Sequence, residues 1–525
     1  MKYKPVIGLE IHAELNTKTK MFCDSLNDPD EKHPNINICP ICLSHPGTLP
    51  VANEDAVKKV IMAGLALNCQ IERDTFFERK NYFYPDLPKG YQISQYQKPL
   101  CYSGELKIKS PSTSSGFKAI RITRIHLEED AGRLYHLPDK NYSLVDFNRA
   151  GVPLMELVTE PDLESGEEVR KFAEELQLIL RYLGVSDADM EKGQMRVEVN
   201  ISLMDVSGEK LEVSKDNSHL SPPTPHVSKL GTKVEVKNIN SIKFAADAVD
   251  YEIRRQTELL EAGEKVKQET RGWDEKKGET YLMRSKEEAQ DYRYFPEPDL
   301  PPLHFEDADI EDIKSQLPEL PQQRRTRFTK RYGLSERYVE IFVVNKQLGD
   351  YYEHVASELD SAAKDYHLRK ELEGALPDEP HISGKLHSIA ANYIITEFPT
   401  LTSSLGQELD IEGLKISPEA FAELMVLIFH KELSSTGAKT VLKEMAETGL
   451  HPEQIMKEKD LSQVSDISEL EASVDKVIVD NPKAVEDYKR GKEASLKFLI
   501  GMVMKGTRGR ANPQLVEEIL RKTLS

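Results

Sequence analysis

The chain has 525 residues, 39% of them hydrophobic and 30% charged, which is typical of water-soluble globular proteins. We expect about two to four domains, because a single core does not extend over this length. No apolar run approaches the roughly 18–20 residues that span a bilayer, and the N-terminus lacks a signal-peptide or transit-peptide pattern, so we expect a cytoplasmic protein without a membrane partner. The net charge of -19 argues against a general nucleic-acid-binding surface, since phosphate is bound by Lys and Arg.

The first segment predicts a half-buried strand. Apolar residues alternate over 7–15 with Glu10, His12 and Glu14, so one face carries ligand-type side chains. A helix is predicted next, over 55–67. The aromatic, Pro-containing stretch 80–86 then predicts an ordered loop.

Further strands and one clear helix follow. The apolar phase flips within 120–127, which indicates a bulge or burial on both faces. A Pro-rich excursion at 205–230, which includes 221–225, separates two of the strands. This pattern predicts an α+β fold with a mostly antiparallel sheet. The predicted strands are 120–127, 195–203 and 234–236, and the helix is 167–183, closed by Gly184.

The remainder of the chain predicts helices. We interpret the Pro-rich stretch 296–302 as the end of the first domain, and helices are expected from about Glu306. Ser417 is a predicted N-cap that precedes Pro418, and a third unit begins nearby. The predicted domains are 1–295, 296–408 and 409–525.

The end of the chain is basic. Between Asn481 and Ser525, ten Lys and Arg residues oppose five Asp and Glu residues, an excess of five positive charges. This is the one region whose charge predicts contact with phosphate.

Several carboxylates and one imidazole predict a metal site. Glu10 and His12 share a strand face, Glu128, Glu129 and Asp130 are consecutive, and Glu156 has apolar neighbours. Carboxylates with one imidazole suit Mg²⁺ or Mn²⁺. The alternative is a set of solvated or ion-paired side chains, and the spacing alone leaves both interpretations open.

Three of the five cysteines predict a zinc site. Cys39 and Cys42 form a C-x-x-C pair, and Cys23 is a third thiol. The fourth ligand would be Asp24, His33 or His45, and the alternative is a set of free thiols in a loop. An odd number of cysteines argues against a disulfide framework.

Missing motifs exclude several enzyme classes. The sequence contains no G-x-G-x-x-G after a strand, no P-loop and no G-x-S-x-G elbow. A Gly/Ser-rich stretch with a glutaminase nucleophile is absent as well. If the protein uses ammonia, another chain must produce it.

Ordered motifs along the chain resemble the GatB family, the B subunits of the aspartyl/glutamyl-tRNA(Asn/Gln) amidotransferases (GatCAB complexes). So many matches in the same order are specific to one family. The matching stretches are 6–12, 46–50, 79–86, 89–95, 126–132, 146–154, 235–241, 291–299, 501–505 and 511–513.

The resemblance implies a fold and an activity. The fold would be a cradle domain like those of glutamine synthetase and guanido kinases, then an all-α helical domain and a YqeY-like helical tail that binds tRNA. The activity would be ATP- and Mg²⁺-dependent amidation of Glu-tRNA(Gln) or Asp-tRNA(Asn). Ammonia would come from a glutaminase (amidase) partner, the A subunit, and the small C subunit would complete the heterotrimer.

The resemblance also assigns residues. The family's Mg²⁺ site falls on Glu10, His12, Glu128, Glu129 and Glu156, and catalytic roles would fall on Glu10, His12, Glu128, Lys80 and Arg149. From motif position, the hypothesis for ATP contacts is Lys80, Lys89, Arg133 and Arg149. Tyr82, Phe83, Tyr84 and Tyr91 would stack the 3′ end of tRNA, although simple loop packing explains them equally. Phosphates of the tRNA body would meet Lys497, Lys505, Arg508 and Arg510.

Two departures and two alternatives accompany the resemblance. Many members carry C-x-C where this chain has Cys23-Asp24-Ser25, so one zinc ligand is missing, and the insertion around 221–225 is longer than expected. One alternative is a tRNA-binding scaffold with a decayed active site, which Glu10, His12 and the acidic triplet argue against. The other is a free-standing carboxylate–amine ligase, which the basic tail argues against.

Overall fold

The computed structural model describes most of the chain. It covers residues 2–28, 30–111, 113–114, 116–137, 140–206, 230–285, 291–372, 383–404, 411, 413–459, 461, 467–507, 511 and 513–524. The chain divides into two compact units, Met1–Leu320 and Pro321–Ser525. The Pro-rich stretch 221–225, Arg508 and Arg510 lie outside the described residues.

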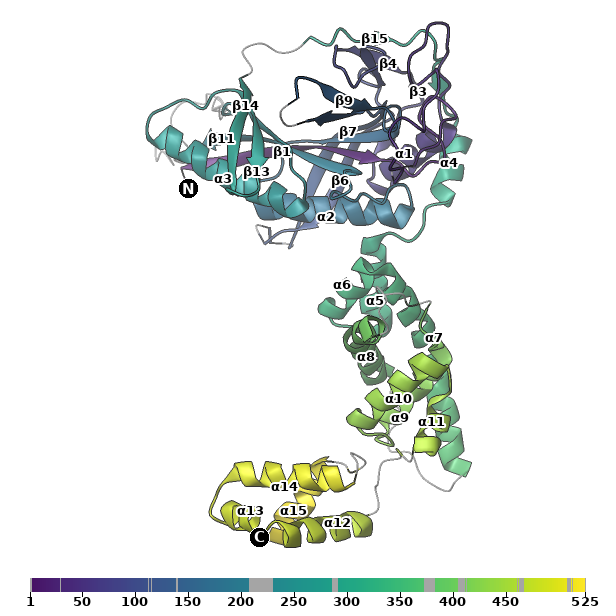
Figure 1. The fold of residues 1–525 in the computed structure, drawn as a ribbon, viewed down its shortest axis with the longest axis vertical. Coiled ribbons are helices and arrows are strands. Elements are labelled where there is room, and N and C mark those ends of the chain that lie inside the picture. The colour runs from purple at the N-terminus through teal and green to yellow at the C-terminus, as the bar shows by residue number, and fades with distance from the viewer. Residues whose placement is uncertain are drawn as a thin grey trace, which may run out of the picture. The chain divides into compact units, whose positions relative to one another are not determined.

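A nine-stranded sheet forms the first unit (Figure 1). Every neighbouring pair is antiparallel except β12 and β13, so the predicted mostly antiparallel α+β architecture is confirmed. In spatial order the strands are β14 (Glu279–Ser285), β13 (Glu269–Asp274), β12 (Val234–Lys237), β11 (Met195–Asp205), β1 (Tyr3–Glu14), β10 (Pro153–Thr159), β7 (Phe117–Glu129), β6 (Cys101–Lys109) and β2 (Gln70–Ile71).

Helices cover one face of this sheet (Figure 1). They are α1 (Glu54–Ala66), α2 (Gly166–Leu183) and α3 (Ile242–Glu261). Gly184 ends α2 in the left-handed region, as predicted. Ile7, Leu9 and Ile11 of β1 are fully or almost fully buried in the core beneath the helices. Because strand side chains alternate, Glu10, His12 and Glu14 lie on the opposite face.

Smaller sheets lie beside the large one. They are β15-β4-β5, with β15 (Phe295–Pro296), β4 (Glu78–Asn81) and β5 (Tyr91–Ser94); β16-β3, with β16 (Leu303–His304) and β3 (Asp74–Thr75); and β8-β9, with β8 (Arg133–His136) and β9 (Ser143–Asp146). The predicted loop at 80–86 therefore begins inside a strand, since Lys80 pairs with Gln92 across β4 and β5. The predicted bulge is confirmed: Val158 pairs with Arg124 and Thr159 with Ile122, which leaves Thr123 as an extra residue in β7.

The first unit continues past the Pro-rich stretch that we interpreted as a domain end. Leu300, Ile310 and Ile313 are buried in its core, the last two on helix α4 (Asp307–Ser315). Glu297 accepts two hydrogen bonds of 2.7 Å from Arg79. The stretch is thus part of the folded unit, because its non-proline residues pack and pair with the sheet domain.

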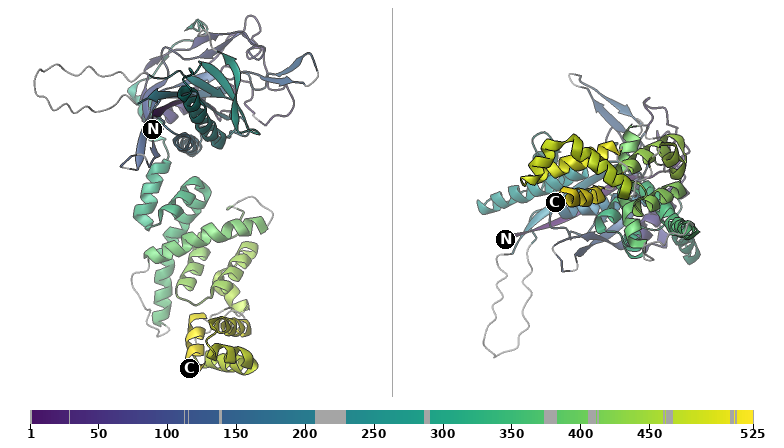
Figure 2. Two further views of the ribbon diagram at one scale, coloured as in Figure 1. Left: turned by 90° about the vertical axis from the view of Figure 1, so that its left-hand side faces the viewer. Right: turned by 90° about the horizontal axis from the view of Figure 1, so that it is seen from below.

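The described elements of the second unit are all helices. Ser417 caps α9 by accepting a hydrogen bond from the Ala420 amide, as predicted. The last four helices share a core of their own, and Figure 2 shows them grouped together near the C-terminus. The helices are α5 (Pro321–Tyr332), α6 (Glu336–Val344), α7 (Lys346–Leu372), α8 (Ser383–Ser404), α9 (Pro418–Phe429), α10 (Ser435–Thr448), α11 (Pro452–Lys459), α12 (Ile467–Asp480), α13 (Pro482–Lys489), α14 (Glu493–Gly506) and α15 (Pro513–Leu524). Within the described part of the chain, none of the helices has the length and apolarity to cross a membrane.

We predict that Glu252 couples the stability of the first unit to pH. Its buried carboxylate on α3 accepts hydrogen bonds from Arg255 at 2.8 and 2.9 Å and from Thr280 at 2.6 Å. Burial alone would raise the pKa of Glu252, but these donors hold it below its ordinary value. The stabilisation is therefore complete above the ordinary carboxyl pKa of about 4.3 and is lost as pH falls through the lowered pKa.

Urea denaturation at several pH values tests this coupling. Glu252→Gln should lower the free energy of unfolding at neutral pH by about 3 kcal/mol, because the pair that this buried carboxylate forms with Arg255 is lost. It should also flatten the acid dependence, whereas Glu258→Gln on the exposed side of α3 should change neither. Equal acid sensitivity in Glu252→Gln and the unmodified protein would contradict the prediction.

Candidate active site

The strand register gathers the site on the open face of the sheet. His12 of β1 lies directly opposite Glu156 of β10, and Glu156 lies opposite His126 of β7. Directly opposite residues of antiparallel strands point to the same face. Glu10 and Glu128 join them, because each is two residues from His12 or His126 along its strand.

Two imidazoles and two carboxylates meet at the centre. His12 Nε2 lies 3.4 Å from Glu128 Oε1 and 3.4 Å from Glu156 Oε2. His126 Nε2 lies 3.5 Å from Glu156 Oε2 and 3.9 Å from Glu128 Oε2. His126, Glu128 and Glu156 are all buried. Carboxylates buried at such density require compensating positive charge.

These donors fit a divalent cation. The ligand atoms of Glu10, His12 and Glu156 lie within 4.8 Å of one another, as do those of His126, Glu128 and Glu156. Carboxylate oxygens are the ligands that Mg²⁺ and Mn²⁺ prefer. Nδ1 of His126 is buried without a hydrogen-bond partner among the described residues, which is the type of atom that a bound group satisfies.

Side-chain cations also face the carboxylates. Arg124 Nη2 lies 3.4 Å from Glu156 Oε1. Burial alone would lower the pKa of Lys80, but Glu128, Tyr294 and Glu156 raise it above its ordinary value. Lys80 therefore remains an ammonium group in the field of the site carboxylates.

The two histidines have opposite protonation preferences. Burial alone would lower the pKa of His12, but hydrogen bonds to Glu128 and Glu156 raise it to about 10. For His126, burial dominates and lowers the pKa. The pKa of Glu10 is raised by burial and by the negative charge of Glu156.

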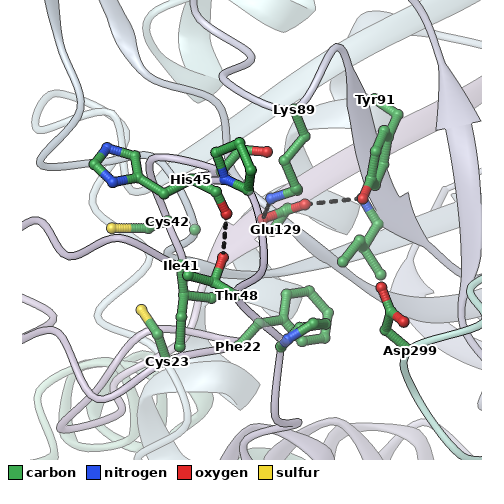
Figure 3. A pocket seen from close by; sticks show the side chains of 15 residues that line it. Phe22, Cys23, Ile41, Cys42, His45, Thr48, Lys89, Tyr91, Glu129 and Asp299 are labelled. Atoms are coloured by element: carbon green, nitrogen blue, oxygen red, sulfur yellow. Dashed lines mark hydrogen bonds and ion pairs between the residues drawn. The ribbon is translucent and has the colours of Figure 1, made fainter.

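Glu129 lies apart from Glu128. It points to the other side of β7, where Lys89 Nζ is 2.6 Å from Oε2 and the Ile93 amide donates to Oε1 at 2.9 Å. Figure 3 shows Lys89 and Glu129 on the wall of a small pocket of about 150 Å³ that Cys23 and Cys42 also line. Of the predicted metal ligands, the structure thus brings together Glu10, His12, Glu128 and Glu156, while Glu129 and Lys89 form a separate pair.

Arg149 belongs to a second charged network. Its Nε donates to Asp130, its Nη2 lies 2.8 Å from Glu14 Oε1, and it also donates to the Gly193 carbonyl at 3.0 Å. Arg196 of β11 donates to both oxygens of Asp130 at 3.0 and 3.1 Å. Burial opposes ionisation of Asp130, but Arg149 and Arg196 lower its pKa to about 2. Burial raises the pKa of Glu14 to about 7.

A larger pocket of about 750 Å³ adjoins this network. Glu14, Arg149 and Arg133 line it, together with the β8–β9 hairpin. The guanidinium of Arg133 lies 5.1 Å from the centre of the Tyr135 ring. Arg133 is therefore placed at this pocket and not in the His12 cluster.

The aromatic residues predicted to contact tRNA occupy different surroundings. Tyr82 packs edge-on against Tyr292, and Tyr91 lies beneath the Arg79 guanidinium at 4.4 Å. Tyr84 and Phe83 are 55% and 92% exposed. Of the four, only Tyr84 and Phe83 have rings that are mostly exposed to solvent. Stacking of tRNA bases on the whole set stays a prediction. In the tail, Lys497 and Lys505 are exposed on α14.

The cysteines supply an incomplete zinc site. The sulfurs of Cys23, Cys39 and Cys42 lie within 4.8 Å of one another, and no His, Asp or Glu of the described residues joins the group. Ser25, two residues after Cys23, has its hydroxyl 3.8 Å from Cys42 Sγ. A hydrogen bond from Cys23 lowers the pKa of Cys42 to about 4. A structural zinc site closes with four ligands, so the described residues do not complete one.

Sequence reasoning missed three residues that the structure places here: His126, Asp130 as an arginine acceptor, and Arg196. His126 could have been found, because it precedes Glu128 by two residues and strand side chains repeat with that period. Arg196 could not, because its partner is 66 residues away and depends on the register of β11.

We predict that Glu128 and Glu129 contribute unequally to metal binding. Glu128→Gln should weaken Mn²⁺ binding by about tenfold or more, because a ligand oxygen at the centre loses its charge. Glu129→Gln is the matched control, with an expected change below about threefold. Isothermal titration of both variants measures the difference, and equal losses would contradict the placement of these carboxylates on opposite faces.

Comparison with known proteins agrees with this architecture. Residues 5–311 match the GatB/GatE catalytic domain, and residues 382–524 match the GatB domain. The B subunits of the aspartyl/glutamyl-tRNA(Asn/Gln) amidotransferases of Caldicellulosiruptor saccharolyticus and Carboxydothermus hydrogenoformans are each 46% identical, and that of Dehalococcoides mccartyi is 44% identical; each alignment covers 100% of this chain and 99% of the relative. The chain therefore belongs to the GatB family, the B subunits of the tRNA-dependent aspartyl/glutamyl amidotransferases.

Proposed function

We propose that this protein uses ATP and Mg²⁺ to activate the side-chain carboxylate of Glu-tRNA(Gln), Asp-tRNA(Asn) or both, and then directs ammonia onto it. The observation that carries the proposal is the cluster of Glu10, His12, Glu128 and Glu156 on the open face of the sheet. The substrate class follows from the names of the relatives, which are subunits of aspartyl/glutamyl-tRNA amidotransferases.

The chemistry explains the need for such a cluster. A carboxylate reacts poorly with ammonia, and phosphorylation by ATP gives an acyl phosphate with a good leaving group. Phosphoryl transfer depends mainly on positioning and on neutralising the phosphoryl oxygens. Mg²⁺ held by Glu10, His12, Glu128 and Glu156 would supply that neutralisation and orient the reacting oxygens.

Lys80 and Arg149 have different roles in the proposed reaction. Lys80 faces Glu128 and Glu156 without an ion pair below 4 Å among the described residues, so its charge is available to a phosphoryl group. Arg149 is held by Asp130, Glu14 and the Gly193 carbonyl. We therefore assign Lys80 to the reacting phosphate and Arg149 to holding the adjoining wall in place.

The other partners follow from the same reaction. Ammonia would come from a glutaminase, the A subunit, with the small C subunit in the same heterotrimer. The exposed Lys497 and Lys505 of α14 would contact the phosphates of the tRNA body, which makes binding depend on salt.

Amide formation by the purified complex tests the proposal. With ATP, Mg²⁺, ammonium chloride and Glu-tRNA(Gln) or Asp-tRNA(Asn), the unmodified complex should form the amide. His12→Ala should lower the rate by roughly 100-fold or more, because a ligand at the centre is lost. His33→Ala is the matched control, since this imidazole is 82% exposed and pairs only with Glu31 among the described residues.

Two further results discriminate between the alternatives. ATP hydrolysis stimulated by Glu-tRNA(Gln) and not by free glutamate would exclude a free-standing ligase. A complex that binds tRNA but forms no amide would instead identify this chain as a scaffold.

A further inference from the structure

Three thiols gather beside the smaller pocket. The sulfurs of Cys23, Cys39 and Cys42 lie within 4.8 Å of one another, and Cys23 and Cys42 line the pocket (Figure 3). A structural zinc ion takes four ligands, and the described residues bring only these three together. Thiols that no complete metal site holds remain open to oxidation, which depends on their access to solvent and on the groups beside them.

Cys39 and Cys42 are the pair that one local turn brings together. The Leu43 amide donates to the Cys39 carbonyl at 3.0 Å, so the chain forms a single helical turn here. The Cys42 sulfur lies 3.9 Å from the Cys39 sulfur and accepts a hydrogen bond from the Cys39 amide at 3.1 Å. A disulfide requires the two sulfurs to be about 2 Å closer, which side-chain rotation and a small tightening of this turn achieve.

The two thiols differ in their access to solvent. Cys42 is 5% exposed, whereas Cys39 is half-buried. An oxidant therefore reaches Cys39 first, and Cys42 is the neighbouring thiol that reacts with the oxidised sulfur. The fully buried Lys20 adjoins the second thiol, since its Nζ lies 3.9 Å from the Cys42 sulfur.

The cysteine turn contacts both sides of the segment that carries Arg149. Before Arg149, the side chain of Asn148 accepts a hydrogen bond of 2.9 Å from the Asn37 amide, just ahead of the turn. After Arg149, a Cβ atom at Gly151 would lie 3.6 Å from the Cβ of Cys42, so the two residues are closely packed. A change in the conformation of the turn therefore reaches Arg149 from both directions.

We propose that Cys39 and Cys42 form a reversible disulfide and that this bridge slows amidation; the second part rests on the proposed function. Closing the bridge turns Cys42 toward Cys39 and alters the packing around Arg149. The pairs of Arg149 with Glu14 and Asp130 hold the wall beside the active site. Displacing groups near a reacting centre by about 1 Å is enough to lower a rate strongly.

The oxidant in this reaction is hydrogen peroxide. The Cys39 sulfur, as a thiolate, attacks one peroxide oxygen; the O–O bond breaks, and a sulfenic acid and a first water form. The Cys42 sulfur then attacks the Cys39 sulfur, the S–O bond breaks, and the hydroxyl group leaves with the Cys42 proton as a second water. Two electrons pass from the two thiols to the peroxide, and a dithiol reductant restores both thiols.

Mass spectrometry of the full complex after peroxide treatment tests the bridge. Trypsin places Cys39 and Cys42 in one peptide, 33–58, and Cys23 in another, 21–32. The expected product is peptide 33–58 with both cysteines protected from alkylation and a mass lower by two hydrogen atoms, and dithiothreitol should reverse it. A link between the two peptides, or zinc held by these thiols with no link formed, would overturn the assignment.

Amide formation by the same samples tests the effect of the bridge. Peroxide should lower the rate of the unmodified complex by about tenfold, and dithiothreitol should restore it. Cys39→Ser should show no loss of rate relative to its own reduced form. Cys69→Ala is the matched control that keeps the sensitivity, since Cys69 is a buried thiol outside the cluster.

The two parts of the proposal fail separately. A bridge that leaves the rate unchanged, or equal peroxide sensitivity in Cys39→Ser and the unmodified complex, would overturn the control of activity. A reduced complex that forms no amide would contradict the proposed function, and the peptide masses would still decide whether the bridge forms.

Discussion

The register of β1 between β10 and β11 determines most of what this protein can do. It aligns His12 with Glu156 and, one strand further, with His126, while Ile7, Leu9 and Ile11 fill the core under the helices. Shifting β1 by one residue would bury the acids and expose the apolar side chains. Because α1, α2 and α3 cover only one face, the burial that stabilises the sheet also fixes which residues face the reaction.

The two central carboxylates of the site are buried, and each is stabilised by the positive side chains around it. Glu128 and Glu156 are removed from water, and an isolated carboxylate in such surroundings would take up a proton. Burial opposes ionisation of Glu128 and Glu156, but His12 and Lys80 hold the pKa values of both carboxyls below the ordinary value. Arg124 lies 3.4 Å from Glu156, and a bound divalent cation would add positive charge at the same place. The adjoining Asp130 is held in the same way by Arg149 and Arg196, so Glu128, Glu156 and Asp130 each depend on positioned cations.

The sequence predicted correctly those features that depend only on residues close together in the chain. The alternation of β1, the glycine cap of α2 and the serine cap of α9 are visible in the sequence, because each follows from neighbouring residues. The choice between Glu128 and Glu129 was not visible, since β7 carries a bulge and is buried on both faces near its end. The Pro-rich stretch was interpreted as the end of the first domain, but the Arg79–Glu297 pair that joins it to β4 connects residues 218 positions apart.

Arg149 illustrates how tertiary structure assigns a role that a motif leaves open. Because the proposed reaction transfers a phosphoryl group, an arginine near the site invites the interpretation of a phosphate ligand, and its guanidinium does have five donors. Here Asp130, Glu14 and the Gly193 carbonyl occupy that guanidinium, so binding a phosphate would require breaking pairs that are largely buried. The side chain is better suited to keeping the wall between the larger pocket and His12 rigid. In the proposed reaction, the charge on the transferred group would then be met by Lys80 and by a cation bound to the carboxylates at the centre of the sheet.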